Sequence, residues 1–276
     1  MTDIHNPTLG PDHFERISDL LYRQCGISLH DGKQALVRAR LVKRLIHLGL
    51  GGFDQYLRYL ESDASGDELR SMVDVLTTNK TSFFREPQHF TFLRAEVLPN
   101  EWRGRDGLRI WSAGCSTGEE PYSLAITLRE EMPDVDRRDP RILATDISTR
   151  VLERARAATY DLDALADVPP PILRRHFHKV AGHDGHFQVS EATRALVRLA
   201  RLNLLGDWPM RGPFDAIFCR NVMIYFDAAT RQQLVGRYWR LLRPGGYLFL
   251  GGAESLSGVE HDFAYVQPAV FRKEGG

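Results

Sequence analysis

The stretch Leu108-Arg-Ile-Trp-Ser-Ala-Gly-Cys-Ser-Thr-Gly-Glu-Glu-Pro-Tyr-Ser-Leu-Ala125 decides the fold of this chain. A short apolar run leads into Gly114 and Gly118, and a helical pattern follows in which Pro121 suits the first turn. Glycines at such a turn let the backbone approach a ligand, because no Cβ stands in the way. The stretch predicts the nucleotide-binding corner of an open α/β sheet, at the carboxyl end of its first strand.

The residues beside these glycines indicate which ligand the corner binds. A phosphate-binding loop would end in Gly-Lys-Ser or Gly-Lys-Thr, whereas Gly118 is followed by Glu119 and Glu120. Two carboxylates repel a pyrophosphate and suit a ligand with positive charge or sugar hydroxyls. Asp146 ends the next predicted strand, where an acidic residue holds a ribose. Adenosine with a cationic sulfur describes S-adenosylmethionine, although an ordinary βαβ unit with a glycine turn has the same pattern.

The composition is that of an ordinary globular protein. The 276 residues are 43% hydrophobic and 26% charged with zero formal net charge, so charge gives no argument for nucleic acid. No apolar run reaches the roughly eighteen residues of a membrane span, and the N-terminus does not resemble a signal peptide. Three distant cysteines, Cys25, Cys115 and Cys219, suit a reducing cytoplasm and argue against a disulfide framework. We therefore expect a cytoplasmic protein without membrane insertion.

The first quarter of the chain predicts a small all-helical bundle. Apolar periodicity indicates helices over residues 11–25, 31–49, 53–60 and 68–76, the second of them capped by Asp31. This second helix carries five Lys or Arg and one Asp in an otherwise neutral protein. Such a face can be a solvated helix surface or a docking face for an acidic protein partner, and the pattern alone does not decide between them.

Residues 77–87 have no clean period and combine hydroxyl side chains, Asn79 and two adjacent Phe. They predict a loop folded over something polar, with a plain linker as the alternative. A connecting helix over 89–97 and a polar break over 99–107 follow.

From residue 108 onward, strands and helices alternate, which predicts a mainly parallel sheet with an antiparallel edge. We expect strands over 108–113, 142–145, 197–205, 216–219, 247–250 and 264–272, and helices over 118–132, 149–158 and 228–242.

Residues 160–189 interrupt this alternation and predict an inserted unit with a short helix over 173–176 and a hairpin of 179–180 with 186–189. Four histidines lie in it, and we expect surface histidines and no metal, because no cysteine or paired carboxylate completes a site of known spacing. The histidines are His176, His178, His183 and His186.

The chain resembles the CheR family of chemotaxis receptor methyltransferases over nearly its whole length. The motifs that carry the resemblance are Leu76-Thr-Thr-Asn-Lys-Thr-Ser-Phe-Phe-Arg-Glu86, Ser116-Thr-Gly-Glu-Glu-Pro-Tyr-Ser123, Ala144-Thr-Asp146 and Phe218-Cys-Arg-Asn-Val-Met-Ile-Tyr-Phe-Asp227. It implies a helical, receptor-docking N-terminal domain over 1–76 and a linker over 77–107 that contributes to the donor site. It further implies a Rossmann-like S-adenosylmethionine-dependent methyltransferase domain over 108–276, with a small antiparallel insert at about 160–190.

The resemblance also implies an activity: methyl transfer from S-adenosylmethionine to glutamate side chains of chemoreceptors, leaving S-adenosylhomocysteine. The implied partners are the cytoplasmic helices of chemoreceptors, and we expect a monomer that binds no nucleic acid. Some relatives bind a receptor's C-terminal peptide through a glycine-rich turn in the insert, and the shorter run 178–186 here argues against that.

The same resemblance assigns residues to roles. Arg85 and Tyr225 are implied to orient the reacting groups, and Arg40, Lys43 and Arg44 to meet the receptor. The donor site comprises Asn79, Thr81, Arg85, Glu119, Asp146, Asn203, Leu204, Arg220 and Asn221, with Gly114 added from the glycine turn. A glutamate with a pKa of about 4.3 is already ionised at neutral pH, so the predicted reaction needs alignment and no general base.

Two other functions are compatible with the sequence. A methyltransferase of the same fold could act on another protein or on a small molecule, although the basic helix and residues 77–86 argue against it. A binding module could hold the donor without turnover, which the presence of Arg85 and Tyr225 disfavours.

Overall fold

The computed structural model describes residues 7–29, 32–102 and 106–275. The chain forms two compact units. The first comprises residues 1–78 together with 225–227, and the second comprises 79–224 and 228–276.

The first unit is all-helical. Its helices are α1 (Pro11–Cys25), α2 (Gln34–His47), α3 (Phe53–Ser62) and α4 (Asp67–Leu76). Gly26 ends α1 in the left-handed region at φ 70°, a conformation that glycine adopts readily at a helix end. The expected cap Asp31 lies outside the described residues, and α2 begins at Gln34. The buried faces are apolar at the predicted spacing, for example Val37, Leu41 and Leu45 of α2.

A buried polar cluster joins three of these helices. Arg44 of α2 donates two Nε–H contacts of 2.8 and 2.9 Å to the carboxylate of Glu68 in α4. Tyr56 of α3 donates its hydroxyl to the same carboxylate at 2.8 Å. The Glu68 side chain is 2% exposed, and its hydrogen bond to Arg44 raises the pKa of the guanidinium. The cluster satisfies a buried charge and fixes how α2, α3 and α4 pack.

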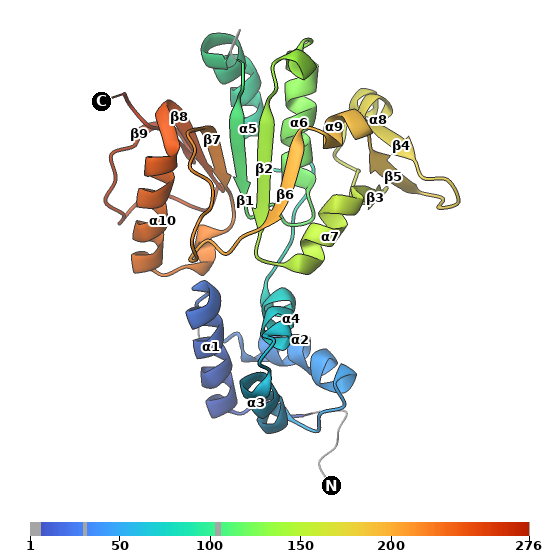
Figure 1. Cartoon of the computed structure of the whole chain (residues 1–276), viewed down its shortest axis with the longest axis vertical. Helices are drawn as coiled ribbons and strands as arrows, with labels where there is room; N and C mark the ends of the chain where they lie inside the picture. The colour runs from blue at the N-terminus through green and yellow to red at the C-terminus, as the bar shows by residue number, and fades with distance from the viewer. Residues whose placement is uncertain (1–6, 30–31, 103–105, 276) are drawn as a thin grey trace. The chain divides into compact units, whose positions relative to one another are not determined.

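The second unit is built on a seven-stranded sheet in the order β6-β2-β1-β7-β8-β10-β9 (Figure 1). Its strands are β1 (Arg109–Ala113), β2 (Arg141–Asp146), β6 (Val197–Arg201), β7 (Phe214–Cys219), β8 (Leu242–Leu250), β9 (Ala264–Gln267) and β10 (Val270–Arg272). β6, β2, β1, β7 and β8 pair in parallel, while β10 pairs antiparallel with both β8 and β9. The predicted parallel sheet with an antiparallel edge is confirmed.

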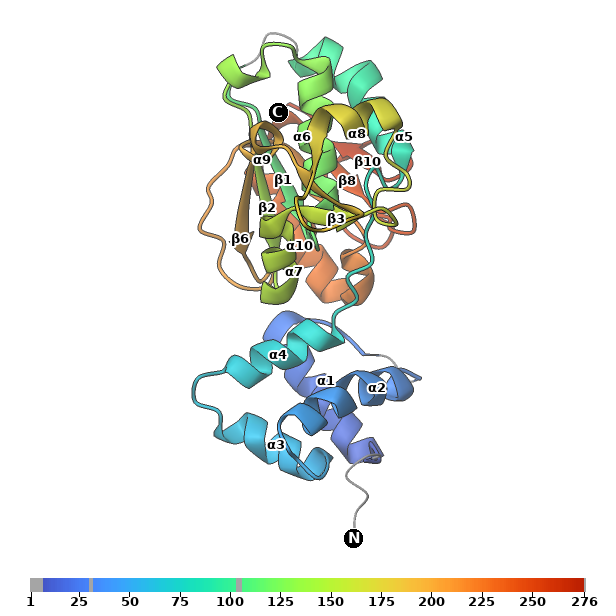
Figure 2. The same ribbon diagram turned by 90° about the vertical axis from the view of Figure 1, so that its right-hand side faces the viewer.

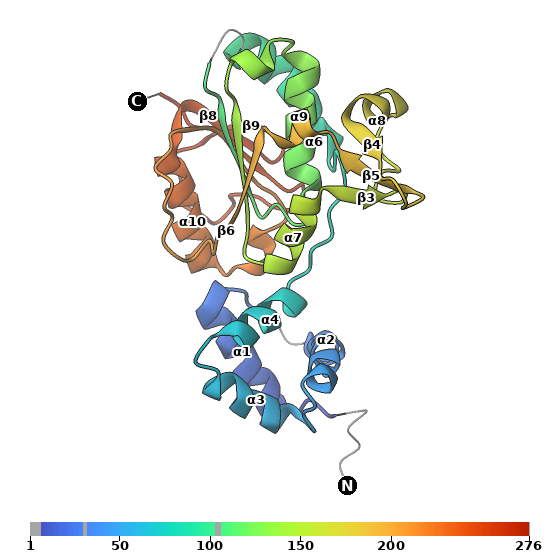
Figure 3. The same ribbon diagram turned by 45° about the vertical axis from the view of Figure 1, so that its right-hand side comes forward.

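Helices cover both faces of this sheet. α6 (Glu119–Glu131) and α7 (Thr149–Ala157) lie on one face and α10 (Ala228–Leu241) on the other (Figures 1 and 3). β7 is buried along its whole length, as expected for a central parallel strand. Because parallel strands point the same way, the loops that follow β1, β2, β7 and β8 gather at one edge of the sheet.

The insert is a separate three-stranded antiparallel sheet in the order β3-β5-β4. It lies on the right-hand side of Figure 1, the side that faces the viewer in Figure 2. Its elements are β3 (Thr159–Asp161), α8 (Pro170–His176), β4 (Phe177–Lys179) and β5 (His186–Val189), followed by α9 (Glu191–Arg194). The predicted hairpin exists, but its first strand lies two residues earlier than expected, and β3 and α9 were missed.

The insert histidines are not all on the surface, contrary to expectation. His176 is buried, and its ring contacts Glu130 at 2.7 Å and Thr193 at 3.1 Å, which ties the insert to α6. His178, His183 and His186 are exposed. Among the residues the structure describes, no group of three His, Cys, Asp or Glu side chains could hold a metal ion.

The connection before β1 differs from the prediction. α5 (Pro87–Phe92) continues directly into a π-helix, η1 (Leu93–Trp102), so the polar break expected from Pro99 begins only after this helix. η1 packs its buried face against α6 and the sheet because Leu93, Val97 and Trp102 belong to the main core.

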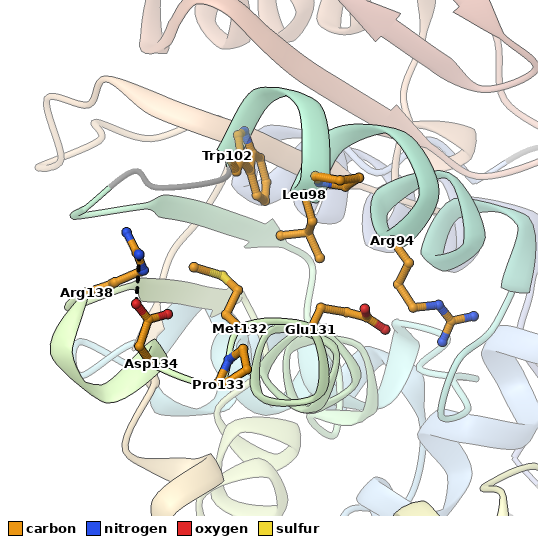
Figure 4. A pocket seen from close by; sticks show the side chains of 9 residues that line it. Arg94, Leu98, Trp102, Glu131, Met132, Pro133, Asp134 and Arg138 are labelled. Carbon is orange, nitrogen blue, oxygen red and sulfur yellow. Dashed lines mark ion pairs between the residues drawn. The ribbon is translucent and has the colours of Figure 1, made fainter.

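A cavity of about 370 Å³ lies between η1 and the end of α6 (Figure 4). Its wall includes Leu98, Trp102 and Met132, with the ion pair of Arg138 and Asp134 at one side. None of the predicted site residues lines it. Separately, within the described ranges no helix has both the length and the apolar character needed to cross a bilayer.

Candidate functional site

The glycine turn after β1 is built for close packing. Gly114 and Gly118 both have φ 101°, a conformation that favours glycine. A Cβ on Gly114 would lie 2.4 Å from the Val222 side chain, and one on Gly118 would lie 2.9 Å from the Tyr160 hydroxyl. Neither position therefore has room for a side chain, and whether a ligand approaches the glycines remains a prediction.

Asp146 fastens this turn to the end of β2. Its two carboxylate oxygens accept the backbone N–H groups of Ser116 and Ser148, each at 2.9 Å. The carboxylate is therefore held at the carboxyl end of β2, where an acidic residue can bind a ribose. The geometry therefore suits the ribose-binding role predicted for Asp146.

Glu119 is a buried carboxylate at the start of α6. Burial raises its pKa, and the Thr117 hydroxyl donates to it at 2.6 Å. Its carboxylate forms no ion pair with any described residue, and at a helix start it lies at the positive end of the helix dipole. A carboxylate held in this way is suited to accept hydrogen bonds from ligand hydroxyls.

Glu120 has a different role from Glu119, which corrects the expectation that both carboxylates face a ligand. Arg220, at the end of β7, contacts Glu120 at 2.9 Å and Glu86 at 3.2 Å, and its side chain is 2% exposed. Ser112 donates to the other oxygen of Glu120 at 2.7 Å. Burial raises the pKa of Glu120, while the Arg220 charge opposes that rise. Glu120 therefore neutralises a buried cation.

The same arginine holds the predicted catalytic segment. The Arg220 guanidinium donates to the carbonyl oxygen of Arg85, so its side chain supports the Arg85 backbone. Phe84 and Glu86, on either side of Arg85, have φ values of 52° and 56°. Such positive φ values cost on the order of 1–3 kcal/mol each and persist where the surroundings enforce them, often at functional sites.

Residues 79–87 form an anchored loop, which argues against a plain linker. Phe83 packs between Tyr160 and Phe177 of the insert, with ring centroids 4.9 and 5.4 Å away. The Phe84 backbone N–H donates to Ser123 at 2.9 Å, and Ser116 donates to the Asn79 carbonyl at 2.9 Å. Thr81 is half-buried in this loop. The loop is thus fixed beside the glycine turn.

The remaining donor-site predictions follow β6 and β7. Trp208 and Arg237 both donate to the Leu204 carbonyl, at 3.1 and 2.8 Å, which fixes the turn at Asn203 and Leu204. Asn221 follows Arg220 with φ 58°, another left-handed residue at the same edge of the sheet.

All ten predicted donor-site residues belong to the second unit. The predicted reacting-group residue Tyr225 belongs to the first unit, where its carbonyl accepts the Ser28 N–H at 3.0 Å. Arg40, Lys43 and Arg44 also lie in the first unit, on α2.

Comparison with known proteins bears on both units. Residues 79–271 match the family model described as CheR methyltransferase, SAM binding domain, and residues 12–77 match the CheR methyltransferase, all-alpha domain. The chain belongs to the CheR family. It is 45% identical to a chemotaxis protein methyltransferase of Escherichia coli K12, over 95% of this chain and 91% of the relative. It is 44% identical to chemotaxis protein methyltransferase 2 of Pseudomonas aeruginosa, over 94% and 92%, and 43% identical to a probable chemotaxis protein methyltransferase of Rhizobium etli, over 92% and 96%.

Membership of the CheR family makes the chain an S-adenosylmethionine-dependent methyltransferase, and the site fits that donor. Buried Glu119 and Asp146 offer carboxylate oxygens to hydroxyl groups, and no phosphate-binding lysine ends the glycine turn. The predicted fold, enzyme class and methyl donor are therefore confirmed. Two supporting carboxylates were not predicted, because the residues they contact lie far away in the sequence: Glu86 pairs with Arg220, and Glu254 accepts the backbone N–H of Asn221.

His89 lies beside this network as a buried neutral base. Its ring is 0% exposed and 3.6 Å from Glu86, and neither ring nitrogen has a hydrogen-bond partner among the described residues. Burial, helped by the nearby Arg220 charge, lowers the pKa of His89 to about 4. The native imidazole stays neutral above pH 4, whereas the unfolded one takes up a proton below about pH 6.5.

The free energy of unfolding should therefore fall as the pH drops from about 6.5 to about 4, and His89 should account for up to about 3 kcal/mol of that fall. In the parent, His89 should add close to one proton to the number taken up on unfolding over this pH range. His89→Leu should remove that proton, so the free energy of urea unfolding should change less steeply with pH. The exposed His178→Leu is the matched control and should keep the parental slope. Equal slopes for the two variants would contradict the assignment.

Proposed function

We propose that this CheR enzyme transfers methyl groups to glutamate side chains on the cytoplasmic helices of chemoreceptors. The observation that carries the proposal is the fixed, backbone-strained segment around Arg85, which lies beside the donor residues of the glycine turn. The names of the relatives and the basic helix α2 support a chemotaxis substrate.

The residues of the chain bind and align the reactants. Glu119 and Asp146 accept the hydroxyl groups of the donor, and Asn203, Leu204 and Asn221 frame the remainder of it. When bound, the donor supplies an electrophilic methyl group on a cationic sulfur.

Arg85 orients the incoming carboxylate. Within the described part of the chain, its side chain makes one hydrogen bond, from a terminal nitrogen to the Lys80 carbonyl at 2.8 Å, and a guanidinium has five N–H donors in total. An ionised glutamate needs no base, so orientation supplies the main lowering of the barrier, roughly 7–11 kcal/mol in well-aligned systems. The Tyr225 hydroxyl is assigned to hydrogen-bond a carboxylate oxygen without neutralising its negative charge.

The direct test is methyl transfer from labelled S-adenosylmethionine to membranes that contain chemoreceptors. The expected product is a base-labile methyl ester that disappears when the acceptor glutamates are replaced by alanine. Labelling that persists on such receptors, or that appears only on other proteins or small molecules, would favour a same-fold methyltransferase with another substrate.

We narrow the proposed receptor-docking residues of α2 to Lys43, because Arg40 and Arg44 make contacts within the helical unit. Arg40 donates to the Leu76 and Thr77 carbonyls and to the Thr78 hydroxyl, which caps the end of α4, and Arg44 is bound to Glu68. Both arginines therefore hold the helical unit together, and reversing their charge would damage the unit itself. Lys43 is exposed, with no hydrogen bond or ion pair to any described residue.

Exposed apolar side chains flank Lys43 along α2. Leu36 is 38% exposed and Ile46 is 51% exposed, at positions seven before and three after the lysine. This spacing places them on one helical face, where they suit contact with a long partner helix. Docking through this face is the role we propose for Lys43.

Lys43→Glu should raise the KM for receptor about 5- to 10-fold at low salt, because an exposed charge attraction becomes a repulsion. The increase should shrink at roughly 1 M salt, where the Debye length is about 3 Å. The measurement is the methylation rate against receptor concentration.

Arg58→Glu is the matched control, because it makes the same charge change at an exposed position of α3 and should leave the KM near the parental value. Equal KM values for Lys43→Glu and Arg58→Glu at low salt would support a merely solvated α2 face.

A further inference from the structure

The loop after β7 is held by a buried carboxylate, Glu254, to which no role has yet been assigned. Glu254 lies after β8 and is 8% exposed. Its Oε2 accepts the backbone N–H groups of Asn221 at 2.8 Å and Gly251 at 2.6 Å, and its Oε1 accepts that of Ile224 at 3.2 Å. The carboxylate forms no ion pair with any residue in the described part of the chain, so three main-chain dipoles stabilise its charge.

These three contacts join the ends of two neighbouring parallel strands. β7 ends at Cys219 and β8 at Leu250, and the pair lies in register at these residues. Glu254 bonds to the segment beyond each of them. It therefore holds the β7 exit in place relative to the sheet.

The segment that Glu254 holds carries the residues assigned to the reaction. Asn221 has φ 58°, which a non-glycine residue keeps only when its surroundings enforce it. Its backbone N–H is bound by Glu254, and Ile224, bound by the same carboxylate, directly precedes Tyr225. On its other side, Val222 fills the space where Gly114 lacks a side chain.

The backbone around Gly251 is closely packed against Asn221 and Glu254. A Cβ on Gly251 would lie 2.4 Å from Asn221 Nδ2, 2.8 Å from Asn221 N and 2.8 Å from Glu254 Oε2. The glycine lets the two loop segments approach, and the carboxylate then bonds to both of them.

From this geometry we infer that Glu254 is a positioning residue for methyl transfer, which sets the backbone of the segment from Asn221 to Ile224 at the donor-site edge of the sheet. The inference rests on the proposed role of Asn221. It requires a carboxylate: all three neighbouring groups are donors, so an amide would direct its own N–H₂ at one of them.

Glu254→Gln is the informative variant because it keeps the size and shape of the side chain. Titration with S-adenosylhomocysteine gives the number of sites that still bind the product, which we count as competent sites. The value of kcat per competent site should fall on the order of 30-fold, as expected for a small misplacement of reacting groups. The melting temperature should fall by only several degrees, because one buried backbone N–H loses its acceptor, so the protein stays folded at the assay temperature. The KM for receptor should not change, since α2 is untouched. Glu260→Gln, at an exposed position six residues later, is the control and should keep the parental kcat.

Glu254→Asp is the second variant, because it keeps the charge but shortens the reach by one methylene. It should also lose rate if carboxylate contacts set the loop. A kcat per competent site within about twofold of the parent in Glu254→Gln would overturn the inference, as would a rate loss matched entirely by lost binding sites or lost stability. The parental enzyme is measured on the same receptor membranes: if it transfers no methyl group there, the proposed function has failed, whereas an active parent with unaffected Glu254 variants refutes this inference alone.

Discussion

Arg85→Ala is expected to lower kcat for methyl transfer by about 100- to 1,000-fold, while S-adenosylhomocysteine still binds. The loop around Arg85 is anchored by Phe83 and by backbone contacts to Ser116 and Ser123, and these do not depend on the guanidinium. Loss of the side chain should therefore remove the orienting hydrogen bonds and leave much of the donor site formed. Single-turnover transfer of a labelled methyl group measures the chemical step, and calorimetric titration measures binding.

Two further variants sharpen this prediction. Arg85→Lys should recover only a small part of the rate, because an ammonium cannot make the planar two-point contact of a guanidinium with a carboxylate. Arg156→Ala removes an exposed arginine from α7 and should keep the parental rate. Transfer by Arg85→Ala at the parental rate would show that Arg85 has no part in aligning the acceptor.

Arg220→Met should cost about 3–5 kcal/mol of stability, because it leaves the carboxylates of Glu86 and Glu120, which are only 18% and 12% exposed, without their shared cation. In a unit of this size, the melting temperature should fall by roughly 10 °C. Without the cation, burial and mutual repulsion should raise the pKa of these carboxyl groups in the folded state. Stability that is present at low pH should then be lost as the pH rises, so the deficit should be larger at pH 8 than at pH 5.

The compensating change is available within the same network. Adding Glu86→Gln and Glu120→Gln to Arg220→Met removes the uncompensated charges and should recover a large part of the lost stability. Thermal unfolding of the parent, the single variant and the triple variant at both pH values gives the comparison. A single variant as stable as the parent would mean that Arg220 contributes to the site in some other way.

The fold could be predicted because its main elements follow local rules. The strand, glycine turn and helix at 108–125 and the alternation that follows are readable from periodicity, and the four N-terminal helices from apolar spacing. The π-helix Leu93–Trp102 could not be predicted, because Pro99 inside it usually ends a helix and tertiary packing of Val97 and Trp102 overrides that tendency. β3 has three residues, too few for a detectable alternation.

The site was predictable in part, and for a different reason. Glu119 and Asp146 lie at strand and helix ends, where general rules place ligand-binding groups. The roles of Arg85, Arg220 and Tyr225 came from family resemblance, since no spacing rule indicates them. The supporting contacts were invisible in the sequence: Arg220 and Glu120 are 100 positions apart, and Glu254 and Asn221 are 33 apart. Such contacts arise only when the strands assemble.

The anchoring of Phe83 has a practical consequence for protein engineering. Its ring occupies an aromatic socket formed by Tyr160 and Phe177, two residues before Arg85. A chimaera that exchanges residues 159–189 for the corresponding module of another enzyme must preserve this socket. Otherwise the graft would release the segment around Arg85 that we propose to orient the acceptor, and we expect turnover to be lost.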